Sequence, residues 1–396
     1  MTQPTPARAV LLLAFAAFTS AAATRAVDPL LVPLADDFGT TPGGASIAVT
    51  AFLLSYGLLQ FFHGPLGDRV GKYRLVFIYT LISGAAMFAS AFAPTLEVLA
   101  AVRFASGAMV GGMITLALAW IGDVVPYERR QGVLAKFMIG QLVGVGGGAA
   151  AAGLVAEHFG WRAVFLLLGV VMLSGALGLW LELRVNVLAQ HKPPPSGRNF
   201  GADLRGVFGL LSRPWVRVVF CAVLLEGMLM YGSLAFMPLH LHQTLGLSVG
   251  ASGAFIMFFA AGGLAYALSA AKLVRRLGEQ GIARLGGAFM AVGVGLVAMA
   301  PSAPVAMAGL FLAGAGFYSF HNTLQTNATQ MAPDARGSGV SLFAFGLFGG
   351  SSLGVLTGSY FVDGIGTRPL LAGCSLGVIG LALYFSMRLG ARKASA

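Results

Sequence analysis

Two long stretches of this chain contain no charged residue, and they restrict what the chain can fold into. Residues 227–271 and 285–333 run for 45 and 49 positions without a single Asp, Glu, Lys or Arg. A helix needs about 20 apolar residues to cross the ~30 Å hydrocarbon core of a bilayer, so each stretch can cross twice. Only 10% of all residues are charged, whereas soluble domains carry about a quarter. The sequence therefore predicts an all-α membrane protein with many spans.

Charges and proline or glycine turns divide the chain into twelve predicted transmembrane helices. The two charge-free stretches must fold back, the first near residues 242–250 and the second between Pro301 and Pro304, where proline interrupts helical hydrogen bonding. The predicted spans are 9–34, 46–66, 74–93, 97–122, 133–156, 162–182, 216–240, 249–271, 283–300, 304–330, 338–361 and 368–388.

The first predicted span also has features of a cleavable secretory signal. Arg8 precedes an apolar run, and the small residues 20–23 resemble a cleavage site. The apolar character nevertheless continues to Leu34, which gives a length that can span. Cleavage would also leave an odd number of spans, so we expect this helix to be retained.

Basic residues are unevenly divided between the two sets of loops. With a cytoplasmic N-terminus, all but four of the 25 Lys and Arg residues lie in or beside cytoplasmic segments. The four exceptions are Arg25 and Arg103 inside spans and Arg162 and Arg368 on the opposite side. Cytoplasmic loops of membrane proteins are enriched in Lys and Arg, so both termini are predicted to be cytoplasmic. The net charge of +11 is then a topology signal, and no nucleic-acid partner is expected.

An internal repeat and a long proline-containing loop divide the chain into two halves. PYERRQG (126–132) follows predicted span four, and PDARGSG (333–339) follows span ten, with proline, arginine and glycine matching at an offset of 207 residues. The longest loop contains HKPPPSGR (191–198), whose prolines cannot continue a helix. Paired six-helix halves are typical of secondary transporters. We predict an N-terminal six-helix half at 1–183, a cytoplasmic linker at 184–215 and a C-terminal six-helix half at 216–396.

The turn between predicted spans two and three reads GPLGDRVGKYR (64–74) and carries four charges in an otherwise charge-free region. It resembles the signature G-x-L-a-D-R-x-G-R-K of the major facilitator superfamily. With the twelve spans and the repeat, the resemblance covers nearly the whole chain. The matching residues are Gly64, Leu66, Asp68, Arg69 and Gly71, with Lys72 in place of arginine. The resemblance implies two pseudo-symmetric halves that transport by alternating access.

The resemblance also implies that this turn is a conformational latch. In the family the acidic residue, here Asp68, meets the amino end of span eleven, here near residues 337–341, whose free N–H groups favour an anion. Asp123, at the cytoplasmic end of span four, resembles the acidic partner of the basic residues in the turn. A generic positive-inside loop would explain the basic residues but not Asp68 or the glycine spacing. The expected latch, which closes the cytoplasmic side in the outward-open state, consists of Gly64, Asp68, Arg69, Gly71, Lys72 and Asp123.

Four charged residues lie well inside the predicted spans, namely Arg25, Asp28, Arg103 and Glu226. Charges at this depth are costly and are functional candidates by default. Arg103 opens RFASG, which resembles the family motif R-x-x-x-G of span four. Asp28 and Arg103 each lie about six residues from the outer ends of their spans, or ~9 Å deep at 1.5 Å per residue, so they could meet. Arg25, one helical turn before Asp28, competes as its partner.

Asp28 has two interpretations. As a proton-coupling group it would alternate between two states, because burial favours the neutral acid and a neighbouring guanidinium favours the carboxylate. As a structural group it would permanently neutralise Arg25 or Arg103. We predict that Asp28, Arg103 and Arg25 couple transport to protons.

Glu226 is the single charge in the middle of span seven, and its sequence neighbours offer no cation. A carboxyl at that depth binds a cationic substrate or stays protonated as a structural group. Span ten carries HNTLQTNATQ (321–330), a run of polar residues that can contact substrate or hold helices together. The predicted substrate-binding residues are Glu226, His321, Asn322, Gln325 and Asn327.

Span five reads GQLVGVGGGAAAAG (140–153) and resembles the antiporter motif G-x-x-x-G-P-x-x-G-G, with Val145 replacing the proline and Ala149 the last glycine. Close helix packing explains small residues at this spacing equally well. Cys221 and Cys374 offer neither a disulfide framework nor a metal site. Phosphate loops and zinc-binding H-E-x-x-H are missing from the sequence, and no nucleophile elbow between a strand and a helix is predicted, so no enzyme, cofactor or metal is predicted.

Together these features predict a monomeric transporter of a bacterial-type inner membrane, resembling the drug/proton antiporter branch. Its predicted activity is export of small, moderately hydrophobic drug-like or metabolite molecules in exchange for protons. Proton-coupled uptake and sugar or metabolite efflux are alternatives, since the antiporter motif is incomplete. A sensor or scaffold on the same fold that transports nothing is a third.

Overall fold

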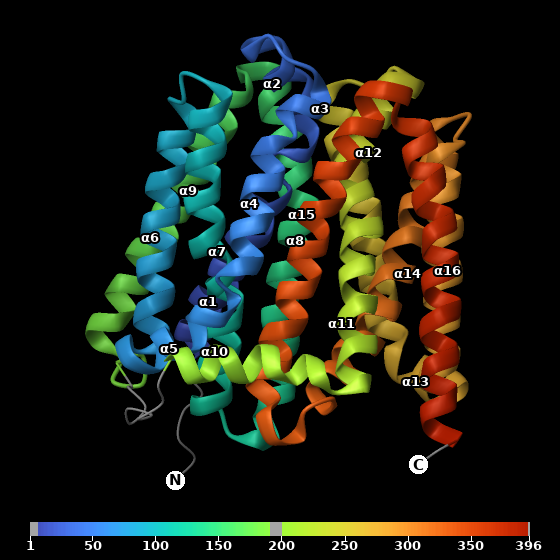
Figure 1. Ribbon diagram of the computed structural model, residues 1–396. Coiled ribbons are helices and arrows are strands. Elements are labelled where there is room, and N and C mark those ends of the chain that lie inside the picture. Colours follow the sequence, from blue (N-terminus) through green and yellow to red (C-terminus); the bar gives the residue numbers. More distant parts are fainter. Residues whose placement is uncertain (1–6, 191–199, 395–396) are drawn as a thin grey trace.

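The computed structural model describes residues 7–190 and 200–394. Every regular element in these two ranges is a helix, and the long helices stand side by side as a bundle (Figure 1). Helix α1 (Ala7–Arg25) begins and helix α16 (Thr367–Ala394) ends at the same face, the lower one in Figure 1. The chain therefore crosses the bundle an even number of times.

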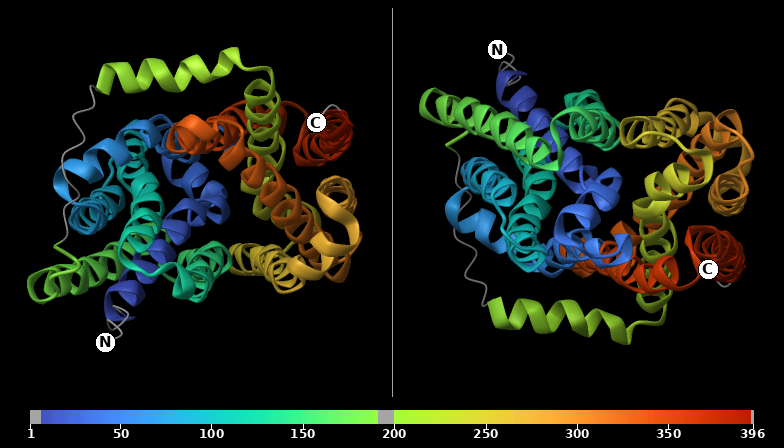
Figure 2. Two further views of the ribbon diagram at one scale, coloured as in Figure 1. Left: turned by 90° about the horizontal axis from the view of Figure 1, so that it is seen from below. Right: turned by 90° about the horizontal axis from the view of Figure 1, so that it is seen from above.

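The helices form two groups, each with its own hydrophobic core, that lie next to each other (Figure 2). One core is built largely from residues 9–189 and the other largely from residues 207–389. The first group contains α1, η1 (Asp28–Leu30), α2 (Leu31–Phe38), α3 (Pro42–Ala45), α4 (Ile47–Leu58), α5 (Gln60–Val70), α6 (Lys72–Ala91), α7 (Leu96–Val124), α8 (Tyr127–Phe159) and α9 (Trp161–Val185). The second contains α11 (Pro214–Glu226), η3 (Gly227–Tyr231), α12 (Gly232–Leu245), α13 (Val249–Ala298), α14 (Ala303–Gln330), η4 (Pro333–Ala335), α15 (Arg336–Ile365) and α16.

Length and apolar composition identify the membrane spans in the described ranges. Ten helical segments are long and apolar enough to cross a membrane, and an eleventh span is bent by 56° between Pro42–Leu58 and Gln60–Val70. Helix α13 accounts for two crossings, because a straight helix of its length would extend ~75 Å at 1.5 Å per residue. It turns at Gly278, whose φ of 64° and ψ of 178° are not helical. The described chain thus contains the twelve predicted spans.

The two predicted fold-backs within charge-free sequence are confirmed. Helix α12 ends at Leu245 before α13 begins at Val249, and α13 ends at Ala298 before α14 begins at Ala303. Serine caps the start of α13, where Ser248 Oγ accepts a hydrogen bond from Ala251 N. Such a cap satisfies a backbone N–H that has no partner within the helix.

The segment between the two groups contains a helix that the sequence did not predict. Helix α10 (Phe200–Gly209) and the short turn η2 (Leu210–Ser212) lie across the lower face of the bundle (Figures 1 and 2). The ring of Phe208 lies 5.4 Å from that of Phe61 and 6.4 Å from that of Phe345, so α10 contacts both groups. The HKPPPSGR motif (191–198) lies outside the described residues.

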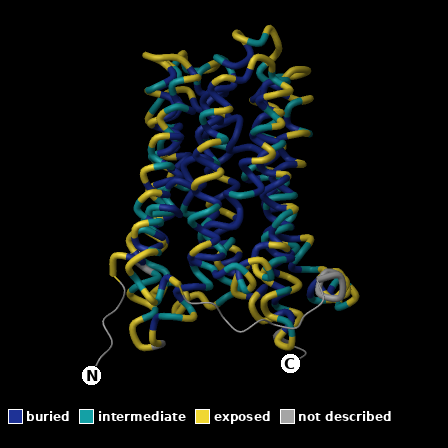
Figure 3. The backbone as a smooth tube through the Cα atoms, turned by 90° about the vertical axis from the view of Figure 1, so that its left-hand side faces the viewer, coloured by how far each residue is buried: buried dark blue, intermediate teal, exposed yellow. Residues whose placement is uncertain are grey.

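Buried residues run through the interior of the bundle, whereas exposed residues lie on its periphery and at its ends (Figure 3). Many of the peripheral residues are apolar: Leu268 is 81% exposed, Leu376 69% and Val170 57%. A surface of this kind is unstable in water but stable against lipid chains, because the bilayer replaces water as the solvent.

Glycines in α8 bring it close to helices of both groups. A Cβ atom at Gly144 or Gly148 would collide with Phe18 or Ala22 of α1, and one at Gly146 would collide with Met257 and Ala260 of α13. Close packing on two sides therefore accounts for the glycine-rich sequence of span five.

Candidate functional site

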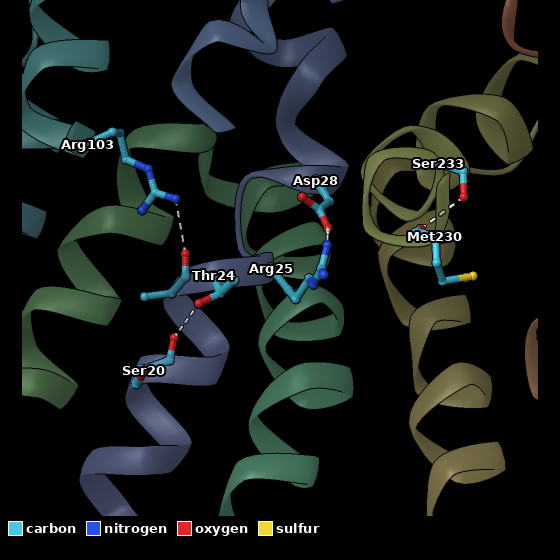
Figure 4. Close-up of polar contacts among 8 residues, drawn as sticks. Ser20, Thr24, Arg25, Asp28, Arg103, Met230 and Ser233 are labelled. Carbon is cyan, nitrogen blue, oxygen red and sulfur yellow. Dashed lines mark hydrogen bonds and ion pairs between the residues drawn. The ribbon is translucent and has the colours of Figure 1, made fainter. Parts of the chain in front are cut away.

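The first span is broken where its two charged residues lie. Helix α1 ends at Arg25, and the 3₁₀ turn η1 begins at Asp28, with Pro29 inside the turn. Arg25 Nη1 donates to Asp28 Oδ2 at 3.2 Å, and both side chains are buried (Figure 4). Broken helices are a recurrent feature of transporter sites, because their backbone groups are free to face a cavity. The ion pair therefore marks a position of functional interest.

Asp28 and Arg103 interact electrostatically, but no direct hydrogen bond or ion pair between them is described. Arg103 is fully buried, with Nη2 donating to Ala23 O at 3.1 Å and Nε donating to Ala48 O at 3.4 Å. Its guanidinium lies 4.0 Å from the centre of the Phe52 ring. In Figure 4 it approaches α1 from the side away from Asp28. The break in α1 leaves the last carbonyls of that helix without helical partners, and one of them takes the guanidinium that was expected to reach the carboxylate.

The seventh span is irregular at its charged residue as well. Glu226 ends α11 and is followed by the π-helical turn η3, after which α12 continues the span. Turns of this type are rare and are found mostly at functional sites. Glu226 Oε2 lies 2.9 Å from His321 Nδ1 of α14, and the Glu226 side chain is completely buried. Two predicted substrate-binding residues that are 95 positions apart thus form one pair.

An aromatic residue missed by the sequence analysis links the two charged pairs. The Arg25 guanidinium lies 4.1 Å from the centre of the Tyr231 ring, and Tyr231 closes the π-helical turn that starts after Glu226. Desolvated cation–π contacts of this kind contribute about 2 kcal/mol. In the sequence, the only indication of this contact is that Tyr231 follows Glu226 by five positions. The contact places the irregular parts of spans one and seven together at the interface between the halves.

Each of these buried charged side chains has one polar atom without a hydrogen-bond partner among the described residues. The atoms are Arg25 Nη2, Asp28 Oδ1, Arg103 Nη1 and Glu226 Oε1. Most buried polar atoms in folded proteins are paired, and each exception calls for an explanation. The site therefore retains capacity to bind a proton or a polar ligand group.

The other predicted substrate residues of span ten do not join this site. Asn322 Nδ2 donates to the Tyr266 hydroxyl at 2.8 Å, and Asn327 Nδ2 donates to Glu279 Oε1 at 2.7 Å. Gln325 is exposed. Asn327 lies six residues beyond His321, or ~9 Å along the helix axis, which carries it past the level of Glu226. Of these four polar residues, only His321 has a described contact with Glu226, and substrate binding by the other three stays a prediction.

The predicted latch residues form contacts within the first half. Lys72 Nζ lies 2.5 Å from Asp123 Oδ2 and 3.5 Å from Asp68 Oδ1, so the pairing of Asp123 implied by the resemblance is present. Asp68 makes no described contact with residues 337–341, and the expected approach to span eleven is not formed in this structure. Gly71 has a φ of 99°, which explains why glycine follows α5.

The remaining two latch residues are not explained by close packing. Gly64 has open space where a Cβ atom would lie, and Arg69 is exposed. The tight glycine of this turn is instead Gly67, where a Cβ atom would meet Leu116 of α7. Gly67 stands at the fourth position of the signature, between Leu66 and Asp68, and was not among the predicted latch residues.

Comparison with known proteins identifies the family. A model described as Major Facilitator Superfamily matches residues 13–355. The chain is 24% identical over 377 residues to the uncharacterized MFS-type transporter YybF of Bacillus subtilis, covering 93% of this chain and 88% of that protein. It is 29% identical over 361 residues to a probable transporter of Streptomyces coelicolor, covering 88% and 80%. The chain belongs to the major facilitator superfamily and is a membrane transporter, not an enzyme.

Solved structures agree with this assignment at the level of the fold. An inward-facing, unoccupied bacterial homolog to the human lysosomal transporter Spinster aligns with a TM-score of 0.76 at 17% identity, over 98% of this chain and 97% of that chain. The nucleoside transporter NupG aligns with a TM-score of 0.76 at 15% identity, over 95% and 98%.

Proposed function

We propose that this transporter exports small organic molecules in exchange for protons, by alternating access of a site between its two halves. The observation that carries the proposal is the Glu226–His321 pair. Its carboxylate is completely buried, faces the π-helical turn at the half–half interface and has one oxygen without a partner. A carboxyl group in this setting exchanges a proton for a cationic or hydrogen-bonding group of the substrate, because its one free oxygen can bind the proton or that group but not both.

The second buried pair supplies the charge balance of the site. Arg25 and Asp28 neutralise each other, and the guanidinium also stacks on Tyr231 of the opposite half. A change in the distance between the halves separates the guanidinium from the ring and so changes the surroundings of the Arg25–Asp28 pair. The proposed division of roles assigns proton exchange to Glu226, with Arg25 and Asp28 coupling that exchange to the movement of the halves.

The rings around the Glu226–His321 pair support a substrate that is partly hydrophobic. The His321 ring lies 5.1 Å from that of Phe317 and 5.3 Å from that of Phe343. Tyr231 lies 4.9 Å from Phe317 and completes an aromatic wall beside the carboxylate. Aromatic faces and a carboxylate together favour organic cations.

The topology proposed for export has both termini in the cytoplasm of a bacterial cell, with one chain as the transporting unit. It rests on the distribution of Lys and Arg, which places nearly all of them at one face. Accessibility of single cysteines introduced at exposed Arg69 and Arg162 tests this orientation. Labelling of the position-69 cysteine from the cytoplasm and of the position-162 cysteine from outside is the expected result.

Proton flux in proteoliposomes tests the activity itself. The protein is reconstituted with a pH-sensitive dye inside, and a panel of organic cations and neutral compounds is added outside. Cations that are substrates should evoke proton movement in the opposite direction, which is lost in Glu226→Gln. Flux that is unchanged in Glu226→Gln for every active compound would overturn the assignment of proton exchange to this residue.

A further inference from the structure

Two carboxylates join the halves at the face opposite the chain termini. Asp363, near the end of α15, accepts hydrogen bonds from Thr41 Oγ1 at 2.7 Å and from Gly43 N at 3.1 Å. Both donors belong to the first half, whereas Asp363 belongs to the second. The carboxylate thus connects the outer end of span eleven to the beginning of span two.

The second carboxylate also joins the two halves, but here the first half supplies the carboxylate and the second half the donors. Glu157, near the end of α8, accepts hydrogen bonds from Ser248 Oγ and from Gly250 N, both at 2.7 Å. It connects the outer end of span five to the beginning of span eight.

The donors of the two contacts are related by the internal repeat. Thr41 and Ser248 are 207 positions apart, as are Gly43 and Gly250, which is the offset that relates the two cytoplasmic loops after spans four and ten. Each hydroxyl also accepts a hydrogen bond from the N–H three residues on, so both cap the helix that they begin. The carboxylates themselves are 206 positions apart. The contact therefore occurs twice, once on each side of the pseudo-two-fold axis.

Glycine permits the close approach in both copies. A Cβ atom at Gly43 would collide with the carboxylate of Asp363, and a Cβ atom at Gly250 would collide with that of Glu157. Two unrelated surface contacts would not be expected to share a hydroxyl donor, a glycine donor and a carboxylate from the opposite half.

We propose that Glu157 and Asp363 are gating residues that form a duplicated clasp, which holds the outer side of the transporter closed and must open in every cycle. The proposal rests on the alternating-access function. Each clasp consists of charge-assisted hydrogen bonds, which are stronger than neutral ones, yet both carboxylates are exposed, which keeps the contact reversible. The outer clasp is the counterpart of the cytoplasmic latch around Asp68. The clasp stabilises the inward-open state, and the latch stabilises the outward-open state.

Distances between spin labels test the clasp without substrate or proton gradient. Labels on cysteines at exposed Glu97 and Ser302 report the separation of the two halves at the outer face. The background lacks the two native cysteines, Cys221 and Cys374. The protein is measured in nanodiscs of bacterial lipid, so failure of the proton-exchange proposal does not affect the result.

The expected result is a shift toward long distances that grows with each clasp removed. Glu157→Gln and Asp363→Asn should each raise the ratio of open to closed outer faces about threefold, and the double variant about tenfold, because the two clasps act on one equilibrium. Asp37→Asn is the matched control, since Asp37 is an exposed carboxylate at the same face that binds Arg162 of its own half. It should leave the distances unchanged.

Two outcomes overturn the proposal: an unchanged distribution in the double variant, or an equal shift in Asp37→Asn. Should the double carboxylate variant fail to fold, Thr41→Val with Ser248→Ala removes one donor from each clasp instead. That pair should shift the distribution in the same direction, whereas Thr41→Ser alone, which keeps a hydroxyl donor, should leave it unchanged. A shift in Thr41→Ser as large as that in the pair would also contradict the clasp.

Discussion

Spans one and seven occupy equivalent positions in the two halves, but they handle a buried carboxylate differently. In span one, Asp28 is paired with Arg25, which lies three residues earlier in the same span. In span seven, Glu226 is paired with His321 of span ten, an imidazole that is charged only if protonated. A guanidinium is always charged, so Asp28 has a permanent counter-charge, whereas the imidazole beside Glu226 supplies one only when protonated. The comparison favours Glu226 as the group that exchanges the proton.

Replacement of Glu226 should have the largest effect on transport. Glu226→Gln keeps the size of the side chain but removes the ionisable group, so gradient-driven transport should fall at least tenfold while the protein remains folded. Glu97→Gln is the control, because Glu97 is exposed near the start of α7. Uptake of a transported cation into proteoliposomes with an imposed pH gradient measures both. Equal transport by Glu226→Gln and Glu97→Gln would show that Glu226 does not couple transport to protons.

Asp28→Asn should act mainly through stability. It leaves the Arg25 guanidinium buried without its partner, and loss of one member of a buried ion pair costs about 3–5 kcal/mol. The double variant Arg25→Met with Asp28→Leu should recover most of that free energy of unfolding, because it removes both charges together. Denaturation in detergent compares the three proteins. A double variant that is both stable and fully active would show that this pair is structural.

Arg103→Ala should destabilise the protein but leave the pH optimum of transport in place. Its N–H groups bind carbonyls of Ala23 and Ala48 rather than Asp28, and hydrogen bonds to charged groups contribute about 1.5–3 kcal/mol. A pH–rate profile next to a thermal unfolding curve separates the two effects. Displacement of the optimum by the substitution would mean that Arg103 reaches Asp28 in another state of the cycle.

Asp68→Asn should have the smallest effect on stability, within about 0.5 kcal/mol, because Lys72 retains its bond to Asp123. It should nevertheless favour the inward-open state, since the proposed latch partner of Asp68 lies in the other half. Labelling rates of a cysteine at a cytoplasmic position and of one at an outer position measure the shift. Identical labelling rates in Asp68→Asn and the parent protein would contradict the latch hypothesis.

Much of the fold was predictable because membrane insertion depends on sequence features that are local and strong. Charge-free runs defined the spans, whereas the direction inferred from the distribution of Lys and Arg stays a prediction. Helix α10 was not predicted, because it has only 10 residues, contains three glycines and follows a proline-containing loop. The twelve-span count also depended on the turn at Gly278, which lies within continuous helix.

The site was only partly predictable, because its contacts join residues far apart in the chain. Burial depth identified the four charged residues, yet equal depth did not bring Asp28 to Arg103, since backbone carbonyls competed for the guanidinium. The pairing of Glu226 with His321 and the stacking of Arg25 on Tyr231 depend on how the helices rotate about their axes. Side-chain direction of this kind is set by packing and is not visible in span boundaries.

Proton release on substrate binding tests the central claim most directly. Purified protein in weakly buffered detergent solution receives a cation that it transports, and a pH-sensitive dye reports the protons released. The account predicts release from the parent protein and from the stable double variant Arg25→Met with Asp28→Leu, but none from Glu226→Gln. Undiminished release from Glu226→Gln would contradict it.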